Sequence, residues 1–395
     1  MVLQGLNIDL TEYRPKYFPA DYFHEETAKF IWQKFGKYVS IEQPCWRTEN
    51  QWELTSNGWV GYIPLDENIT IKLNPKVPIG NLFRMLEYAY RLKLVVVERL
   101  FEAETLDEFY ERLARILAMR ILDRKTKGLY RQYIDIKEEL PFLRGRIQFQ
   151  EIAKKPWGVN LPSYYQELTQ DISDNQLLAW TMFVVIRSGI CSSNTIPIVR
   201  KAYREMQRFV EVLPFSSKDC INRLYHRLNE DYEPMHVLCR FFLENSGPTI
   251  NIGDHFMLPF LIDMAKLFEL FVAEWLKKNL PDEYDLVIQD TVKFGTLGEI
   301  IFNIDVVINE KQTGKTIYVL DTKYKIPDSP ASPDIHQIVS YSVAKQCNNA
   351  VLVYPAELEN PFDGELQGIN IRTLAFSVEG NIEDEGKKFL DQLFS

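Results

Sequence analysis

The stretch IFNIDVVINEKQTGKTIYVLDTK, residues 301–323, contains two apolar runs joined by a short polar segment with one glycine. Both runs are rich in β-branched, aliphatic and aromatic residues, which is the composition of buried strands. Between them, Gly314 can take the positive φ that a tight connection requires. The stretch therefore predicts an antiparallel hairpin, and this hairpin decides how the carboxyl-terminal part of the chain is interpreted.

The predicted hairpin carries charged residues at the end away from its turn. If the connection has five residues, 311–315, Asp305 lies directly opposite Asp321, and cross-strand Cβ atoms are roughly 5 Å apart. Lys323 shares a face with Asp321, because residues two apart in a strand point the same way. Buried unpaired charge is expensive, and a hard divalent ion such as Mg²⁺ prefers carboxylate oxygens. The pattern indicates a metal-assisted phosphodiester site, and the alternative is an edge hairpin with surface charges.

The acid-x-Lys tripeptide is not specific by itself. It occurs four times, as Asp123-Arg124-Lys125, Asp135-Ile136-Lys137, Asp321-Thr322-Lys323 and Glu385-Gly386-Lys387. Only the third follows a strand-like run that can pair with an earlier strand bearing an aspartate. The prediction therefore depends on the hairpin and its flanks.

The flanking segments add a helix on each side of the hairpin. Residues 264–276 have apolar side chains at helical spacing, and Glu269 sits at the edge of that stripe. Ser332-Pro333 can cap and begin a second helix, on which Gln337 and Tyr341 share a face. Both side chains can donate hydrogen bonds to phosphate oxygens. The plainer interpretations are a solvated helix charge for Glu269 and a polar helix edge for the other two.

A further strand is predicted at residues 350–354, which gives the order helix, strand, strand, strand, helix, strand. This order resembles the PD-(D/E)xK nuclease superfamily, and more closely the McrC nuclease subunit of McrBC modification-dependent restriction systems. The resemblance is carried by LFELFV (267–272), NIDVVI (303–308), VLDTKYK (319–325), HQIVSY (336–341) and AVLVYP (350–355), with LNPKVPIGNLFRMLEYAY (73–90) and LRGRI (143–147) nearer the amino terminus. One departure is that Asp305 follows Ile304 and not proline, but the proline of the motif is not a ligand.

The resemblance implies an α/β fold. Residues 251–395 would form a restriction-endonuclease-like domain, a mixed sheet flanked by helices. An α+β region, 1–150, and a helical connecting region, 151–250, would precede it, with a boundary near the breaker Gly247-Pro248. Within the first region, a hairpin is expected around residues 141–145.

The resemblance also assigns roles to the site residues. Asp305, Asp321, Glu269 and the carbonyl of Thr322 would hold Mg²⁺, with Mn²⁺ as a possible substitute. Lys323 would orient the attacking water and offset charge on the phosphate. Gln337 and Tyr341 would steady the phosphate or that water.

A partner is implied as well. McrC-like subunits work with McrB, an AAA+ GTPase that forms hexamers and recognises double-stranded DNA, which can be modified. The amino-terminal half of this chain would engage that ring and stimulate its GTPase. Two alternatives stay open: a GTPase activator or scaffold with an inert nuclease fold, and a stand-alone PD-(D/E)xK nuclease of repair or recombination.

Composition excludes several other classes. With 46% hydrophobic and 25% charged residues, the 395-residue chain is typical of globular proteins. The longest uncharged apolar run, 177–186, is too short to span a bilayer, and the amino terminus shows no secretion signal. Five scattered cysteines favour neither disulfides nor structural zinc, so a cytoplasmic location is expected. Without a Walker-type GK[ST], the chain should not hydrolyse nucleotides itself.

The charge distribution is unusual for a nuclease. The net charge is −10, and residues from 251 onward hold 12 Lys and Arg against 23 Asp and Glu. An acidic domain repels the phosphate backbone of DNA and should bind free DNA poorly. The functional interpretation is that another protein delivers the DNA, and the plainer one is that the acidity only aids solubility. Residues 112–146 hold ten basic against four acidic side chains, which suits DNA, an acidic partner or a solvated helix face. Trp46, Trp52 and Trp59 suit base stacking less well than core packing.

Overall fold

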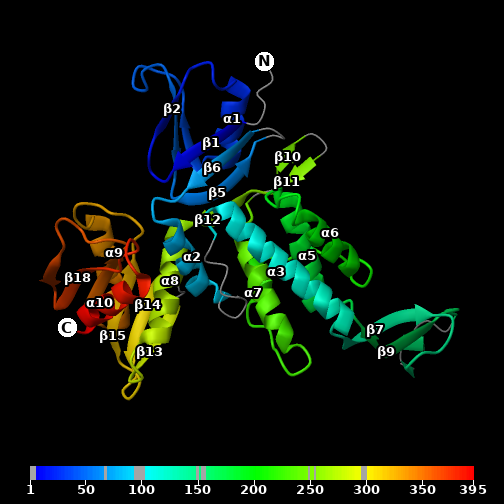
Figure 1. The fold of residues 1–395 in the computed structure, drawn as a ribbon. Helices are drawn as coiled ribbons and strands as arrows, with labels where there is room; N and C mark the ends of the chain where they lie inside the picture. The colour runs from blue at the N-terminus through cyan, green and yellow to red at the C-terminus, as the bar shows by residue number, and fades with distance from the viewer. Residues whose placement is uncertain are drawn as a thin grey trace. The chain divides into compact units, whose positions relative to one another are not determined.

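The computed structural model describes residues 6–65, 69–92, 103–147, 151–152, 157–247, 250–252, 255–294 and 300–395. By contacts the chain forms two compact units (Figure 1), Met1–Leu106 together with Gly247–Ser395, and Asp107–Ser246. The first unit joins residues that the sequence analysis assigned to separate regions. The two units are defined by the contacts within each of them and not as domains. The division into regions 1–150, 151–250 and 251–395 therefore stays a prediction.

The carboxyl-terminal part of the first unit contains a six-stranded mixed sheet. Its order is β13–β14–β15–β16–β18–β17, in which β15, β16 and β18 run parallel and the other pairs are antiparallel. The strands are β13 (Tyr284–Phe294), β14 (Ile300–Glu310), β15 (Thr316–Thr322), β16 (Asn349–Tyr354), β17 (Asp363–Leu366) and β18 (Ile369–Ala375). The predicted hairpin is β14 and β15, joined by the five expected residues, 311–315.

Helices cover both faces of this sheet. Every residue of β16 from Ala350 to Tyr354 is buried, as expected for a central strand packed on two sides. α9 (Ser332–Lys345) packs on β15, β16 and β18 through a cluster that includes Ile338. α8 (Met264–Asn279) and α10 (Ile382–Phe394) meet at Phe376, whose ring contacts Trp275 of α8 and Phe389 of α10. The predicted mixed sheet with flanking helices and the predicted order of elements are confirmed.

One detail of α9 differs from the prediction. Ala331 is the N-cap residue, and Ser332 is already the first helical residue without a side-chain cap. Pro333 lies in the first turn, as expected, because its missing N–H has no partner there. Thus proline, and not a serine cap, marks this helix start.

The amino-terminal part of the first unit is built on two small sheets. One has the order β1–β6–β5–β12, from β1 (Leu6–Thr11), β5 (Trp59–Pro64), β6 (Ile69–Asn74) and β12 (Phe260–Asp263). The other contains β2 (Lys16–Phe18), β3 (Val39–Glu42) and β4 (Trp52–Ser56), next to α1 (Glu25–Phe35). β12 comes from the segment just before α8, and α2 (Ile79–Ala89) packs on α8. These two contacts explain why residues far apart in sequence form one unit.

The second unit is mainly helical. It contains α3 (Leu106–Lys127), α5 (Ser173–Ser188), α6 (Ile196–Met206), α7 (Glu233–Glu244) and the short helices η3 (Ser217–Cys220) and η4 (Glu230–Tyr232). A three-stranded sheet comprises β7 (Gln132–Leu140), β8 (Arg146–Ile147) and β9 (Leu161–Thr169). The expected hairpin around residues 141–145 is wrong, because β9 lies between β7 and β8 and pairs with β7 over nine positions.

A short hairpin of β10 (Ile250–Ile252) and β11 (His255–Met257) precedes β12. Over the described ranges, every helix is too short or too polar to cross a membrane.

Candidate functional site

The β14–β15 hairpin brings Asp305 beside Asp321. Val306 pairs with Leu320 and Val307 with Val319, so the next position in this register sets the two aspartates opposite each other. One carboxyl oxygen of Asp305, Oδ2, accepts hydrogen bonds from the amide and the hydroxyl of Thr322, both at 2.8 Å. The aspartate of one strand is therefore fixed on the end of the other.

Lys323 links this strand end to α9. Its Nζ atom lies 2.6 Å from Oδ2 of Asp321 and donates a hydrogen bond of 2.9 Å to Oε1 of Gln337. The amide of Gln337 in turn donates to the hydroxyl of Tyr341 at 2.7 Å. Asp321, Lys323, Gln337 and Tyr341 thus form one continuous polar chain from β15 to α9, as their expected shared faces require.

Glu269 approaches from α8, whose first turn is capped by the side chain of Asp263. The carboxylate of Glu269 accepts a hydrogen bond of 3.1 Å from Nε2 of Gln289 on β13. Gln289 was not anticipated from the sequence. Ile288 pairs with Val306 and Asp290 with Ile304, which leaves Gln289 opposite Asp305 without a ladder pair.

The backbone of Gln289 is strained. Its φ is 51°, in the left-handed region that non-glycine residues rarely adopt and that costs on the order of 1 kcal/mol or more. Such strain often accompanies functional sites, where the surrounding structure fixes it. A glutamine in the middle of a strand of mixed apolar and polar residues gives no local signal of this conformation, so only the structure reveals it.

Negative charge is crowded at this end of the sheet. Burial, followed by the charge of Asp305, raises the pKa of Asp321 to about 7, although Lys323 opposes this shift. Burial and then Asp305 also raise the pKa of Glu269. For Lys323, burial alone would lower the pKa, but the attraction of Asp321 and neighbouring carboxylates outweighs burial and raises it. The charge of Asp305 thus raises the pKa of both Asp321 and Glu269, while Lys323 is paired with Asp321.

The donor set fits a hard divalent cation in its chemistry. Carboxylate oxygens come from three adjacent elements, and Oδ2 of Asp321 is buried with no hydrogen bond besides its ion pair. Within the described residues, no three His, Cys, Asp or Glu side chains stand together as a ready ligand group. Each carboxylate is held by a protein donor instead: Asp305 by Thr322, Asp321 by Lys323, and Glu269 by Gln289.

The other three acid-x-Lys tripeptides lie in different settings. One is on α3, one is on the exposed strand β7, and one is on α10, where Gly386 packs against the ring of Trp275. Only Asp321-Thr322-Lys323 ends a strand beside another aspartate-bearing strand, as predicted.

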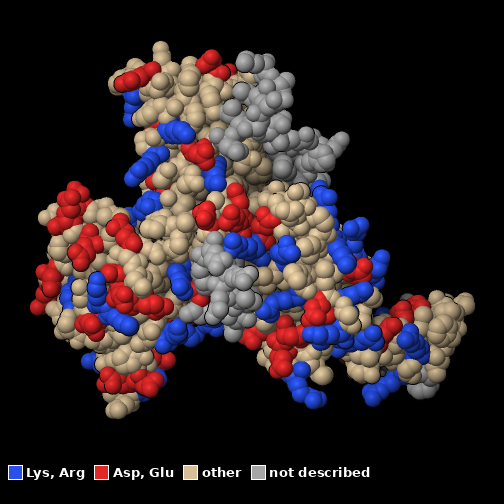
Figure 2. Space-filling view, viewed as in Figure 1, with Lys and Arg blue, Asp and Glu red and all other residues tan. Residues whose placement is uncertain are grey.

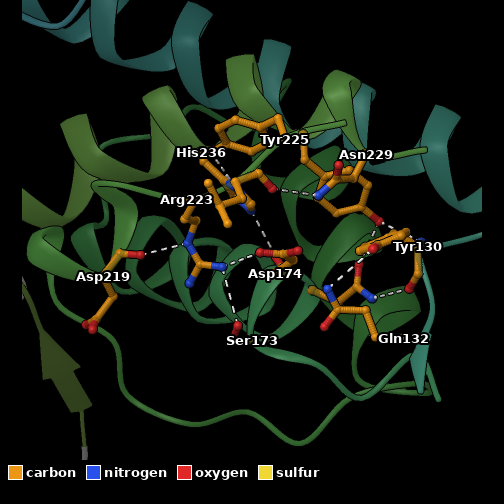
Figure 3. A network of polar contacts seen from close by, with 12 residues as sticks. Tyr130, Gln132, Ser173, Asp174, Asp219, Arg223, Tyr225, Asn229 and His236 are labelled. Carbon is orange, nitrogen blue, oxygen red and sulfur yellow. Dashed lines mark hydrogen bonds and ion pairs between the residues drawn. The ribbon is translucent and has the colours of Figure 1, made fainter. Parts of the chain in front are cut away.

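A second polar cluster lies within the helical unit (Figure 3). Arg223 forms an ion pair with Asp174, and the buried ring of His236 joins the Asp174 carbonyl to the hydroxyl of Tyr225. A carbonyl oxygen only accepts, so Nε2 of His236 carries the proton and Nδ1 accepts from Tyr225. The groups satisfy one another and attach the irregular segment before α7 to α5, so we interpret this cluster as structural.

Two of the tryptophans differ in their burial. Trp52 is buried with its indole donating to the Ala20 carbonyl, whereas Trp46 is 88% exposed.

Within the basic stretch, residues 112–146, Arg124 and Lys125 form ion pairs with Asp231 and Glu205. On the face shown in Figure 2, Lys and Arg side chains run along the helices of the second unit, interspersed with acidic ones. Some of the basic side chains of this stretch are therefore paired with acidic side chains of the same chain.

Comparisons with known proteins agree with this architecture. The family model described as "McrBC 5-methylcytosine restriction system component" matches residues 54–355. The "Type IV methyl-directed restriction enzyme EcoKMcrBC" of Escherichia coli (strain K12) is 23% identical over 214 residues, 52% of this chain and 60% of that protein's length. A solved structure, a half-complex from a tetradecameric assembly of Thermococcus gammatolerans McrB AAA+ hexamers with bound McrC, aligns with 98% of this chain and 100% of the matched chain. Its TM-score is 0.56 at 18% identity, so this likeness concerns the fold.

Proposed function

This chain belongs to the family of McrBC 5-methylcytosine restriction system components, and from that premise we propose that it is the DNA endonuclease subunit of such a system. In this proposal the six-stranded sheet with α8, α9 and α10 is a PD-(D/E)xK nuclease domain. The observation that carries the proposal is the register of Asp305 with Asp321, which sets two carboxylates and the ammonium of Lys323 at one strand end.

The proposed site divides the work among its residues. Asp305, Asp321 and Glu269, with the carbonyl of Thr322, would hold Mg²⁺, and Mn²⁺ could replace it. The ion, when bound, supplies Lewis-acid stabilisation of the charge that develops on the phosphate. The ammonium of Lys323 orients the attacking water and offsets that charge, and Gln337 keeps the ammonium aligned through its 2.9 Å hydrogen bond. Tyr341 supports Gln337 from the next turn of α9.

The proposed partner is an AAA+ GTPase of the McrB kind, which would form a hexamer and deliver double-stranded DNA. The amino-terminal part of this chain would engage that ring and stimulate GTP hydrolysis. Two observations support this division of labour: the matched Thermococcus gammatolerans structure is an assembly of McrB AAA+ hexamers with bound McrC, and residues from 251 onward are strongly acidic. An acidic nuclease domain binds free DNA poorly and gains from a partner that brings it.

The test combines the purified chain with its GTPase partner, GTP, Mg²⁺ and plasmid DNA. We expect cleavage by the natural chain and a loss of at least about 100-fold in Asp305→Asn and Asp321→Asn. Asp285→Asn, at an exposed position at the start of β13 and opposite Asn309, is the matched control and should cut normally.

Each alternative gives a different result. GTPase stimulation without any cutting would favour an activator with an inert nuclease fold. Cutting by the isolated chain at physiological salt would favour a stand-alone nuclease. Full activity of Asp305→Asn would remove the proposed site altogether.

A further inference from the structure

The residue after Lys323 turns away from the proposed site. Tyr324 is 5% exposed and packs against Phe268 of α8, with ring centroids 5.9 Å apart. Its hydroxyl donates a hydrogen bond of 3.3 Å to Oε2 of Glu12, which directly follows β1 of the amino-terminal sheet. The strand end that carries Lys323 is therefore attached to a segment 312 residues away in sequence.

Glu12 is itself fixed and nearly inaccessible. Its exposed fraction is 1%, and Oε2 also accepts a hydrogen bond of 3.0 Å from the amide of Lys76. The backbone amide of Glu12 donates to the carbonyl of Asn74 at 3.1 Å. The Nζ atom of Lys76 lies 4.4 Å from the ring centroid of Tyr324, within the range of a cation–π interaction. A buried carboxylate, a buried phenol and a half-buried ammonium thus form one cluster.

This charged cluster stabilises the fold less efficiently than apolar side chains in the same place would. A buried carboxylate loses its hydration, and apolar residues of similar size often fill such a place at lower cost. A charged, hydrogen-bonded cluster fixes the relative positions of its side chains, because its hydrogen bonds form only in one geometry. The Oε1 atom of Glu12 is buried and has no protein hydrogen-bond partner.

The backbone around Lys323 needs such an anchor. β15 ends at Thr322, and beyond it Lys323 keeps one backbone bond to β16, from its amide to the carbonyl of Val353 at 2.8 Å. Further along, Lys325 pairs with Asp334 of α9 at 2.6 Å. The amide of Lys325 donates to the carbonyl of Lys323 at 2.8 Å, so Tyr324 is the middle residue of a tight three-residue turn. Fixing the side chain of Tyr324 therefore restrains the backbone of the turn that begins at Lys323.

We propose that Glu12 and Lys76 are positioning residues for Lys323 and act through Tyr324. The amino-terminal sheet, in this view, holds the strand end so that the ammonium faces Asp321 and Gln337. The inference rests on the proposed nuclease role of Lys323. It adds that the rate of the chemical step depends on two residues that lie just beyond strands β1 and β6 of the amino-terminal sheet, outside the proposed site.

The experiment uses the full chain with two readouts. Tyr324→Phe removes only the hydroxyl, Glu12→Ala removes the acceptor, and Glu12→Gln keeps a neutral acceptor at the same place. Asp9→Asn is the matched control, because Asp9 lies exposed on the same strand β1. With partner, GTP, Mg²⁺ and plasmid, we expect kcat to fall about 10-fold in Tyr324→Phe and Glu12→Ala with KM unchanged, and Glu12→Gln to recover part of it.

The second readout is hydrogen exchange of the backbone amides, which needs no nuclease activity. Exchange in residues 321–325 should rise in Tyr324→Phe and Glu12→Ala, while residues 350–354 of β16 stay protected as in Asp9→Asn. Unchanged exchange at 321–325 would overturn the inference, and so would an equal loss of kcat in Asp9→Asn. If the natural chain itself does not cut DNA, the nuclease proposal fails, and the exchange result still decides whether Glu12 positions this segment.

Discussion

The Nζ atom of Lys323 lies 2.6 Å from Oδ2 of Asp321, two residues earlier in the chain, and the Asp321 side chain is only 2% exposed. Because this carboxyl is cut off from water, the lysine is its main source of compensation. The pair therefore contributes to folding and to the proposed chemistry at the same time, and substitutions can separate these two contributions.

Lys323→Met should both abolish cleavage and destabilise the fold. The variant leaves a buried carboxylate without its partner, and we expect the free energy of unfolding at pH 8 to fall by roughly 1 to 3 kcal/mol. Adding Asp321→Asn removes the uncompensated charge and should restore stability without restoring cleavage. Denaturant unfolding and plasmid cleavage measure the two effects. A double variant as unstable as Lys323→Met would contradict this account of the pair.

Gln289→Gly should separate backbone strain from side-chain function. Glycine adopts the observed φ of 51° without strain, so we expect an unchanged or higher melting temperature. Cleavage should fall several-fold, because Glu269 loses the hydrogen bond that orients it. Gln289→Asn is the matched comparison, since asparagine also tolerates positive φ but has a shorter side chain. Normal cleavage by Gln289→Gly would show that the amide has no role in the site.

Gly386→Ala should destabilise the carboxyl-terminal part of the first unit. A Cβ atom there would lie 2.2 Å from Cζ2 of Trp275, whose ring is fully buried and cannot move aside. Overpacking of this kind costs about 1 to 3 kcal/mol. Gly80→Ala is the control, because Gly80 of α2 has nothing within 4 Å of the added atom and alanine favours helix by up to about 1 kcal/mol. Equal melting temperatures for the two variants would contradict the close packing of Gly386 against Trp275.

His236 should make the helical unit sensitive to acid. Burial, and then the charge of Arg223, lowers the pKa of its imidazole to about 4, whereas an unfolded chain titrates near about 6.5. Below about pH 6.5, His236 binds a proton in the unfolded chain but stays neutral in the folded chain until the pH approaches 4. The stability due to neutral His236 is therefore full above about pH 6.5 and is lost as the pH falls toward 4.

Unfolding measured between pH 7 and 4 should show this loss, on the order of 1 to 3 kcal/mol, and His236→Gln should show a flatter dependence. His24→Gln, at an exposed position before α1, should follow the natural chain. Identical curves for His236→Gln and the natural chain would exclude His236 as the source of acid sensitivity.

Local sequence patterns determined much of the proposed site. The composition of two apolar runs predicted the hairpin, and the five-residue connection predicted its register. Lys323 was expected on the same face as Asp321, because side chains two apart in a strand share a face whatever the rest of the chain does. Helical spacing likewise put Gln337 and Tyr341 on one face of α9, and their hydrogen bond follows from it. These features depend on residues within one or two elements, so the sequence contains them directly.

Only the tertiary structure decided which distant segments meet. β12 completes the amino-terminal sheet, β9 enters between β7 and β8, Gln289 takes its left-handed backbone opposite Asp305, and Tyr324 reaches Glu12. A local pattern tells which side chains share a face, but not what that face will contact, because packing and the burial of polar groups are settled over the whole chain at once.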